Sequence, residues 1–140
     1  ALPPRTDYDT LRLHATLLWQ GQPVHLSALH PMPPLSSAYA QARDHALRDE
    51  ALRLSQSGGL GVMAGDLNTT PWARGLWGAE QAQMRRAGPG VPTWPNAWGW
   101  LSVLPLDHVL ASPGWQLVEA HTGPDLGSDH RPMVVRLVAR

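Results

Sequence analysis

The chain has 140 residues, which is enough for one domain with a single hydrophobic core. Its 11 basic residues are all arginines and balance 11 acidic residues, so the formal net charge is zero, which disfavours non-specific binding to nucleic acid. The absence of cysteine excludes disulfides, thiolate metal sites and cysteine nucleophiles.

A β-hairpin is the first predicted element. The runs LRLHATLLW (11–19) and VHLSALH (24–30) are typical of strands, and the Gln, Gly, Gln and Pro between them favour a turn. His30 therefore falls at the C-terminal end of a strand. The prolines of HPMPPL that follow prevent further sheet pairing and predict a surface loop.

An amphipathic helix covering a sheet is expected over residues 38–55, with Ser36 and Ser37 as candidate N-caps. Its apolar residues share one face, and two pairs of opposite charges are spaced four residues apart. The apolar residues are Ala40, Leu47, Ala51 and Leu54, and the pairs are Asp44 with Arg48 and Asp49 with Arg53.

The run LGVMAGDLN (60–68) predicts an interior strand, because its residues are apolar on both faces. Thr70 and Pro71 have the chemistry of an N-cap and first helical residue, which predicts a second helix running to about residue 84. A Gly-, Pro- and Trp-rich loop follows over residues 87–105, and long structured loops are more often functional than ordinary connections. Three strand-like runs complete the chain at 106–112, 115–123 and 130–139.

Side chains capable of acid–base chemistry stand at the ends of these predicted strands. Taken singly, an Asp before a turn is more often a turn cap, and a His is more often a structural residue. Taken together, the ordered set is much more specific than its members. The set consists of His30, the pair Asp66 and Asn68, the pair Asp107 and His108, and the pair Asp129 and His130.

Asp66 and Asn68 are two residues apart, so on an extended chain their side chains point the same way. A carboxylate beside a neutral amide suits a phosphate group. The carboxylate can orient or deprotonate water or bind Mg²⁺ through oxygen, and the amide can donate to a phosphoryl oxygen. Asp107 is expected to fix the tautomer of a histidine, with His130 as its partner and Asp129 available as a ligand for a hard cation.

Four motifs occur in order along the chain: ALHPMPP (28–34), GDLNTTPW (65–72), LDHVLAS (106–112) and GSDHRPMVVRL (127–137). With them the sequence resembles the endonuclease/exonuclease/phosphatase superfamily, the DNase I-like metal-dependent phosphoesterases. The resemblance covers residues from about 11 to the C-terminus. It implies an α/β fold in which two sheets pack as a DNase I-like sandwich with outer helices, here as one domain over residues 1–140.

The resemblance also implies roles. Asp66 matches the residue that positions or deprotonates the attacking water, Asn68 its partner at the scissile phosphate, and His30 a donor to a phosphate oxygen. Asp107 would orient His130, which contacts the phosphate or assists the nucleophile.

Asp129 would lie close to the metal, for which the resemblance implies Mg²⁺, with Mn²⁺ as the alternative. The implied activity is metal-dependent hydrolysis of a phosphodiester or phosphomonoester, by a nuclease or a phosphatase, with the substrate left open. Nucleic acid is one candidate substrate. Arg131 is a candidate phosphate contact and Trp94 a candidate stacking residue, although an ion pair and a core lid are equally good interpretations. Trp98 and Trp100 are alternatives to Trp94.

The sequence departs from the family upstream. Complete members have a strand ending in Asn and another ending in Glu, the principal metal ligand, before the hairpin, and neither motif is found here. We therefore expect the fold to be incomplete at its N-terminus and this chain alone to be weak or inactive. An exposed sheet edge would then favour self-association, and the alternative function is a non-catalytic binding or assembly module.

The location of the protein is open. No run of about 18 apolar residues predicts a membrane span in this chain. The motifs HPMPP and TWP resemble those of bacterial members that are often the soluble part of membrane-anchored proteins.

Overall fold

The computed structural model describes residues 10–97 and 103–140. These residues form a five-stranded sheet in the order β1-β2-β3-β5-β4 and a two-stranded sheet of β6 and β7. β2 and β3 are parallel, and the other neighbouring strands are antiparallel. The strands are β1 (Leu11–Trp19), β2 (Gln22–His30), β3 (Leu60–Asp66), β4 (Arg85–Arg86), β5 (Asp107–Ala111), β6 (Trp115–Thr122) and β7 (Met133–Ala139). The helices are α1 (Ser37–Ser55), the 3₁₀ turn η1 (Arg74–Leu76) and α2 (Trp77–Gln81).

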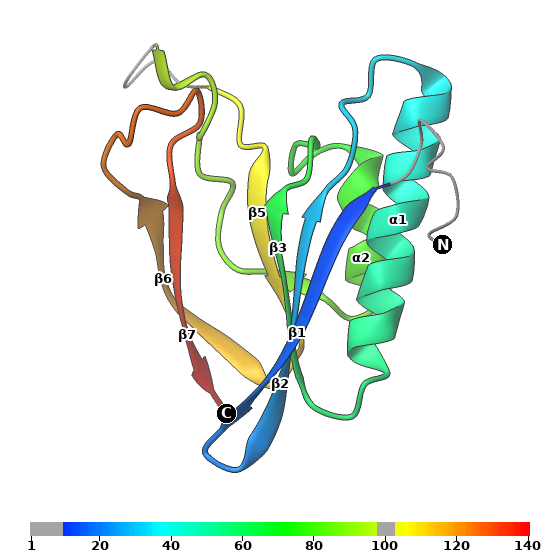
Figure 1. Cartoon of the computed structure of the whole chain (residues 1–140), viewed down its shortest axis with the longest axis vertical. Helices are drawn as coiled ribbons and strands as arrows, with labels where there is room; N and C mark the ends of the chain where they lie inside the picture. Colours follow the sequence, from blue (N-terminus) through cyan, green and yellow to red (C-terminus); the bar gives the residue numbers. More distant parts are fainter. Residues whose placement is uncertain (1–9, 98–102) are drawn as a thin grey trace, which may run out of the picture.

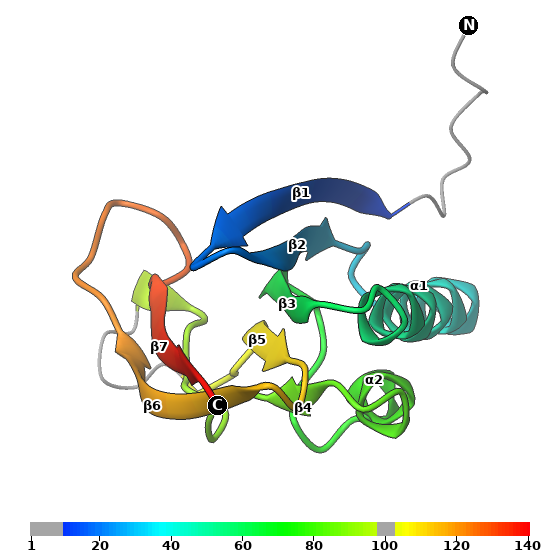
Figure 2. The same ribbon diagram turned by 90° about the horizontal axis from the view of Figure 1, so that it is seen from below.

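The elements form three layers (Figures 1 and 2). α1 and α2 cover one face of the five-stranded sheet, and the β6–β7 hairpin lies on the side of the other face. The expected α/β class, with two sheets facing each other and helices outside, is confirmed. β3 lies between β2 and β5, as predicted for an interior strand.

The predicted hairpin is formed by β1 and β2, which pair from Trp19 opposite Gln22 to Leu11 opposite His30. Its turn is shorter than expected because only Gln20 and Gly21 lie outside the strands. Both have positive φ angles, 50° and 78°, which is the backbone geometry that matches the twist of a two-residue hairpin.

The predicted long helix is also confirmed. Ser36 is the N-cap, and its Oγ accepts a hydrogen bond from the backbone N–H of Tyr39 at 3.2 Å. Leu47 and Leu54 of α1 are fully buried against Met63 and Leu110 of the sheet in the hydrophobic core. The ion pairs predicted between residues four apart on this helix differ from those that the structure shows. Arg43 pairs with Asp44, and Arg53 pairs with Glu50.

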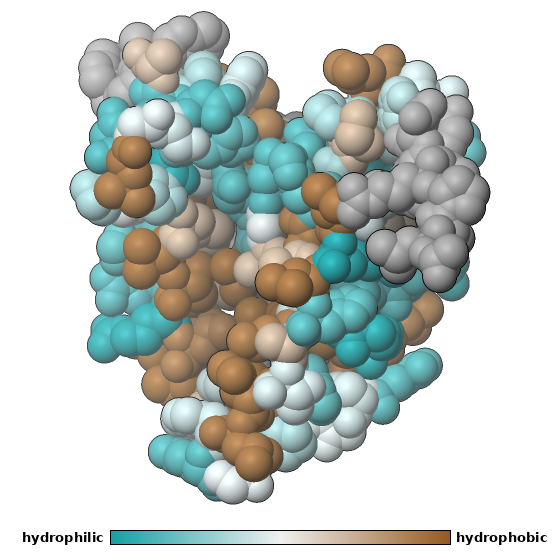
Figure 3. All heavy atoms as spheres, in the orientation of Figure 1, coloured by the Kyte–Doolittle hydropathy of each residue, from teal (hydrophilic) through white to brown (hydrophobic). Residues whose placement is uncertain are grey.

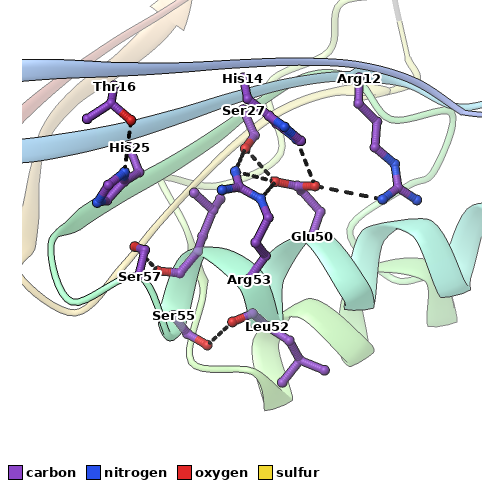
Figure 4. Close-up of polar contacts among 11 residues, drawn as sticks. Arg12, His14, Thr16, His25, Ser27, Glu50, Leu52, Arg53, Ser55 and Ser57 are labelled. Atoms are coloured by element: carbon purple, nitrogen blue, oxygen red, sulfur yellow. Dashed lines mark hydrogen bonds and ion pairs between the residues drawn. The ribbon is translucent and has the colours of Figure 1, made fainter.

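Glu50 is a buried carboxylate between α1 and the hairpin (Figure 4), with only 1% of its side chain exposed. Its Oε1 accepts hydrogen bonds from Ser27 Oγ and Arg53 Nε, both at 2.6 Å, and its Oε2 lies 3.1 Å from His14 Nε2. Burial alone would raise the pKa of Glu50, but the hydrogen bonds from Arg53, Ser27 and His14 outweigh it and hold the pKa below its ordinary value.

The depressed pKa of Glu50 predicts a pH-dependent contribution to stability. Because the folded state holds this carboxylate more acidic than the unfolded state, its contribution is present above the ordinary pKa and is lost as the pH falls through the folded value. Glu50→Gln should lower the free energy of unfolding by about 2 kcal/mol at pH 7 and by much less near pH 3. Urea unfolding at both pH values measures this difference. Glu119→Gln, in an exposed ion pair with Arg136, is the control and should change stability by less than about 1 kcal/mol.

The structure differs from the predicted second helix. Residues 70–73 form a turn, in which the backbone N–H of Ala73 donates to the carbonyl of Thr70 at 3.0 Å, so Thr70 is not an N-cap. Helical structure begins only at η1 and continues as the five-residue α2. Leu76 and Ala79 are completely buried there, so packing against α1 decides where the helix lies.

The side of the five-stranded sheet that faces β6 and β7 is apolar and partly open. Leu13 and Leu17 of β1 are 70% and 53% exposed. A pocket of about 310 Å³ separates β1 and β2 from β6 and β7, and Figure 3 shows the apolar side chains gathered there. Trp19 and Trp115 approach across it, with ring centroids 5.9 Å apart. Among the described residues, no helix is both long and apolar enough to cross a bilayer.

Candidate active site

Three acid–base side chains meet at one end of the five-stranded sheet. Asp66 ends β3 and lies directly opposite Asp107, which begins β5, so both side chains share the face turned toward β6 and β7. His30 ends β2, which runs parallel to β3 with Ala28 opposite Ala64. Because His30 and Asp66 each follow these alanines by two residues, they share that face too.

Asp66 has two differently used oxygens. Its Oδ1 accepts a hydrogen bond from the backbone N–H of Asn68 at 2.9 Å. Its Oδ2 lies 3.6 Å from His30 Nε2 and 3.7 Å from His130 Nε2. Burial raises the pKa of Asp66, the charge of Asp107 adds to the rise, and the Asn68 N–H and the two histidines oppose it.

His130 precedes β7 and is held by Asp107. Its Nδ1 lies 2.7 Å from Asp107 Oδ2, and since an ionised carboxylate only accepts, Nδ1 carries the proton. The expected pairing of these two residues is therefore present. Burial alone would lower the pKa of His130, but the hydrogen bond and charge of Asp107 and the charges of Asp66 and Asp129 raise it above its usual value.

The prediction that Asn68 lies on extended chain, with its side chain pointing the same way as that of Asp66, is wrong. Its φ is 47°, and it turns the chain immediately after Asp66. Its Nδ2 donates to the carbonyl of Pro31 at 2.9 Å, which ties the loop after His30 to the turn after Asp66. Residues 66–68 thus form an Asx-type turn, where the sequence predicted extended chain.

Two buried residues hold this turn, a role that the sequence did not predict for either of them. Arg43 of α1 donates from Nη1 to the carbonyl of Asn68 at 2.7 Å, and His108 Nε2 lies 2.7 Å from the carbonyl of Thr69. Burial lowers the pKa of His108 and so favours its neutral form. A signal for Arg43 existed, since it lies four residues before Leu47 on the apolar face of the helix.

The remaining candidates lie around this centre. Asp129 is exposed, with its Oδ1 3.4 Å from Ser128 Oγ. Arg131 lines a pocket of about 300 Å³ together with Asp107 and His130, and its Nε is buried with no hydrogen-bond partner among the described residues. Trp94 is half-buried and forms a β-bridge with Leu104. The alternatives Trp98 and Trp100 lie outside the described residues.

A second pocket, of about 490 Å³, adjoins the centre from the hairpin side and is lined by His30 and Asp66. Gly65 lines both pockets, so they flank the end of β3. Volumes of this order suit small ligands and groups of larger substrates. The acid–base groups are therefore accessible from two sides.

The described residues do not make up a metal site by themselves. In residues 10–97 and 103–140, no group of three or more His, Asp or Glu side chains is placed to hold an ion. Mg²⁺ requires near-octahedral coordination by about six oxygens, including waters. The described residues alone therefore do not supply a complete ligand set for the expected Mg²⁺ or Mn²⁺.

Residues 2–130 match the Endonuclease/Exonuclease/phosphatase family. The chain therefore belongs to that family, as the motifs at its strand ends implied. None of the curated proteins compared with the chain matches it.

Solved structures share the fold. An endonuclease/exonuclease/phosphatase from Beutenbergia cavernae is 21% identical with TM-score 0.70, covering 91% of this chain and 39% of its own. Humanized D. rerio TDP2 is 16% identical with TM-score 0.73, covering 93% and 61%. A mannosyl-6-phosphatase from Bacteroides thetaiotaomicron is 15% identical with TM-score 0.65, covering 85% and 52%. The chain thus spans less than two thirds of the length of each.

Proposed function

We propose that this chain supplies the hydrolytic centre of an enzyme that cleaves a phosphoester with water. The observation that carries the proposal is the convergence of His30, Asp66, Asp107 and His130 from four separate segments at one end of the sheet. Family membership supports the same reaction class. The structural relatives support the fold on which it would take place.

Asp66 is the proposed general base. The Asn68 N–H occupies Oδ1, while Oδ2 lies toward the two histidines, and Asp66 lines the pocket of about 490 Å³. Its raised pKa makes it a stronger base than an ordinary aspartate, so it accepts a proton from water more readily as the water attacks phosphorus. The attacking oxygen forms a bond to phosphorus as the ester P–O bond breaks, and the leaving alkoxide takes up a proton from solvent.

The two histidines are the proposed donors to the phosphoryl oxygens. Their Nε2 atoms lie 3.6 and 3.7 Å from Asp66 Oδ2, which is too long for a hydrogen bond, so their donor capacity is available to a substrate. The raised pKa of His130 favours the imidazolium form, which stabilises the negative charge that builds up on those oxygens.

The proposal also covers the metal and the substrate. We expect Mg²⁺ or Mn²⁺, with oxygen ligands beyond those of the described residues. The relatives include a mannosyl-6-phosphatase and a TDP2 complexed with single-strand DNA product, so phosphomonoesters and nucleic acid are both candidate substrates. Arg131 is a proposed phosphate contact and Trp94 a proposed stacking residue.

Replacing the histidines tests their unequal anchoring. His130 is held by Asp107 and its side chain is 22% exposed, whereas His30 is 62% exposed. We expect His130→Gln to lower kcat about 100-fold or more and His30→Gln to have the smaller effect. Asp107 already holds His130 in place, so His130 loses less conformational freedom than His30 when it donates to a phosphoryl oxygen. Initial rates with bis-p-nitrophenyl phosphate measure both. Equal losses, or a larger loss for His30→Gln, would contradict these roles.

Assembly is a second candidate function, favoured by β1. This strand is an edge of the sheet and is exposed along all nine residues. Free backbone groups on an edge can pair with a second copy of the chain. Concentration-dependent sedimentation, with Leu13→Lys as the variant expected to weaken self-association, tests this candidate.

A further inference from the structure

We propose that Asn96 is a positioning residue that keeps His130 aligned with Asp107. The inference rests on the proposed function, because alignment matters for catalysis only if His130 acts on the substrate. Its structural part, the link between Asn96 and the His130–Asp107 hydrogen bond, is testable without any turnover.

Asn96 is buried, and its side-chain amide donates hydrogen bonds to the loop before β7. Its Nδ2 donates to Asp125 Oδ1 and to the carbonyl of Ser128, both at 2.8 Å. Its backbone N–H donates to the carbonyl of Asp129 at 2.7 Å. All three of its N–H donors therefore hold residues within five positions of His130.

Thr93 completes the contact and extends it to Asp107. Its carbonyl accepts from the backbone N–H of Arg131 at 2.8 Å, and its Oγ1 lies 3.5 Å from the backbone nitrogen of Asp107. Residues 93–96, TWPN, thus touch the backbone on both sides of His130 and the start of β5. Asp107 begins β5 and His130 lies in the loop before β7, and residues 93–96 contact the chain at both places.

Ser128 connects Asn96 to His130 through hydrogen bonds. Ser128, whose carbonyl accepts from Asn96, also accepts the backbone N–H of His130 on its Oγ at 3.2 Å. Asp125 accepts from Asn96 and from the backbone N–H of Gly127, and these two bonds lower its pKa. The loop is otherwise exposed from Pro124 to Asp129. Its order therefore depends on the buried amide rather than on a core of its own.

An amide is the side chain that this position requires. Both acceptors of Nδ2 are oxygens, one of them a carboxylate, so Asn96→Asp of nearly equal shape would remove two donors and place a second negative charge beside Asp125. The two backbone hydrogen bonds that join residues 93–96 to Asp129 and Arg131 would remain. The loop should therefore shift rather than unfold.

The experiment compares Asn96→Asp with Ser27→Ala by nuclear magnetic resonance at one fixed pH. The probe is the low-field proton of His130 Nδ1, which reports its hydrogen bond to Asp107. Ser27→Ala is the matched control, because Ser27 is also buried and makes two side-chain hydrogen bonds, to Glu50 and from Arg53, away from the site. We expect Asn96→Asp to lose the signal and Ser27→Ala to keep it.

The same variants are compared for hydrolysis in the intact polypeptide. Asn96→Asp should lower kcat about 10- to 100-fold with little change in KM, and Ser27→Ala should leave both close to wild type. An unchanged His130 signal in folded Asn96→Asp would overturn the proposal. If Asn96→Asp does not fold, Asp125→Asn replaces it, with a weakened signal expected and an unchanged signal again overturning the proposal. If the wild-type polypeptide has no turnover and Asn96→Asp still loses the His130 signal, the proposed function is refuted and the link between Asn96 and the His130–Asp107 hydrogen bond stands.

Discussion

Asp66→Asn is expected to lower kcat for phosphoester hydrolysis by about 10²- to 10⁴-fold. The amide keeps the shape of the side chain and leaves an oxygen to accept the N–H of Asn68, but it cannot take a proton from water. It also removes the charge that faces the Nε2 atoms of His30 and His130. Initial rates with a p-nitrophenyl diester measure the loss.

A surface acid provides the control for this substitution. Asp49 lies on the exposed side of α1, so Asp49→Asn removes the same charge without touching the site. Its rate should equal that of wild type. Circular dichroism of both variants checks that neither has unfolded. A folded Asp66→Asn protein that kept its rate would remove Asp66 from the mechanism.

Gly65→Ala is expected to cost about 3 kcal/mol or more of unfolding free energy. Gly65 has φ 149°, which side chains of L residues rarely adopt, and an added Cβ would lie 2.0 Å from the carbonyl oxygen of Leu29. β2 and β3 would have to separate at that point. Leu29 and Gly65 directly precede His30 and Asp66, so the substitution should also move the two acid–base groups apart.

Gly58→Ala separates the two causes of this loss. Gly58 also has a positive φ, 75°, but nothing lies within 4 Å of an added Cβ. We expect it to cost about 1 kcal/mol, from the backbone alone. Urea unfolding of both variants measures the difference. Equal losses would show that the close approach of β2 and β3 does not limit residue 65.

Local signals in the sequence predicted those elements that the structure forms from local chemistry. The prolines after His30, the Ser36 cap and the apolar run before Asp66 each act within a few residues, and the hairpin, α1 and β3 follow them. The Thr70–Pro71 signal failed because η1 and α2 are placed by burial of Leu76 and Ala79. β4 has two arginines and no strand pattern, since its pairing with β5 is a tertiary contact.

In the candidate site, too, local sequence signals predicted some features, and contacts between distant segments determine the others. His30, Asp66 and Asp107 stand at strand ends that the sequence indicates, and His130 precedes β7. Strand order then brings the four together. The supporting contacts could not be predicted, because they join distant segments. Arg43 reaches the turn at Asn68 across 25 positions, and Asn96 reaches Ser128 across 32. Such contacts depend on the folded arrangement and leave no periodic signal.

The rate of phosphoester hydrolysis by the wild-type protein tests most directly whether this chain supplies a hydrolytic centre. Initial rates are measured with bis-p-nitrophenyl phosphate and p-nitrophenyl phosphate, with and without Mg²⁺, for this chain and for the intact polypeptide as it occurs naturally. We expect turnover of at least one ester by the intact polypeptide and loss of that turnover in Asp66→Asn. No turnover of either ester by the intact polypeptide, with or without Mg²⁺, would contradict it.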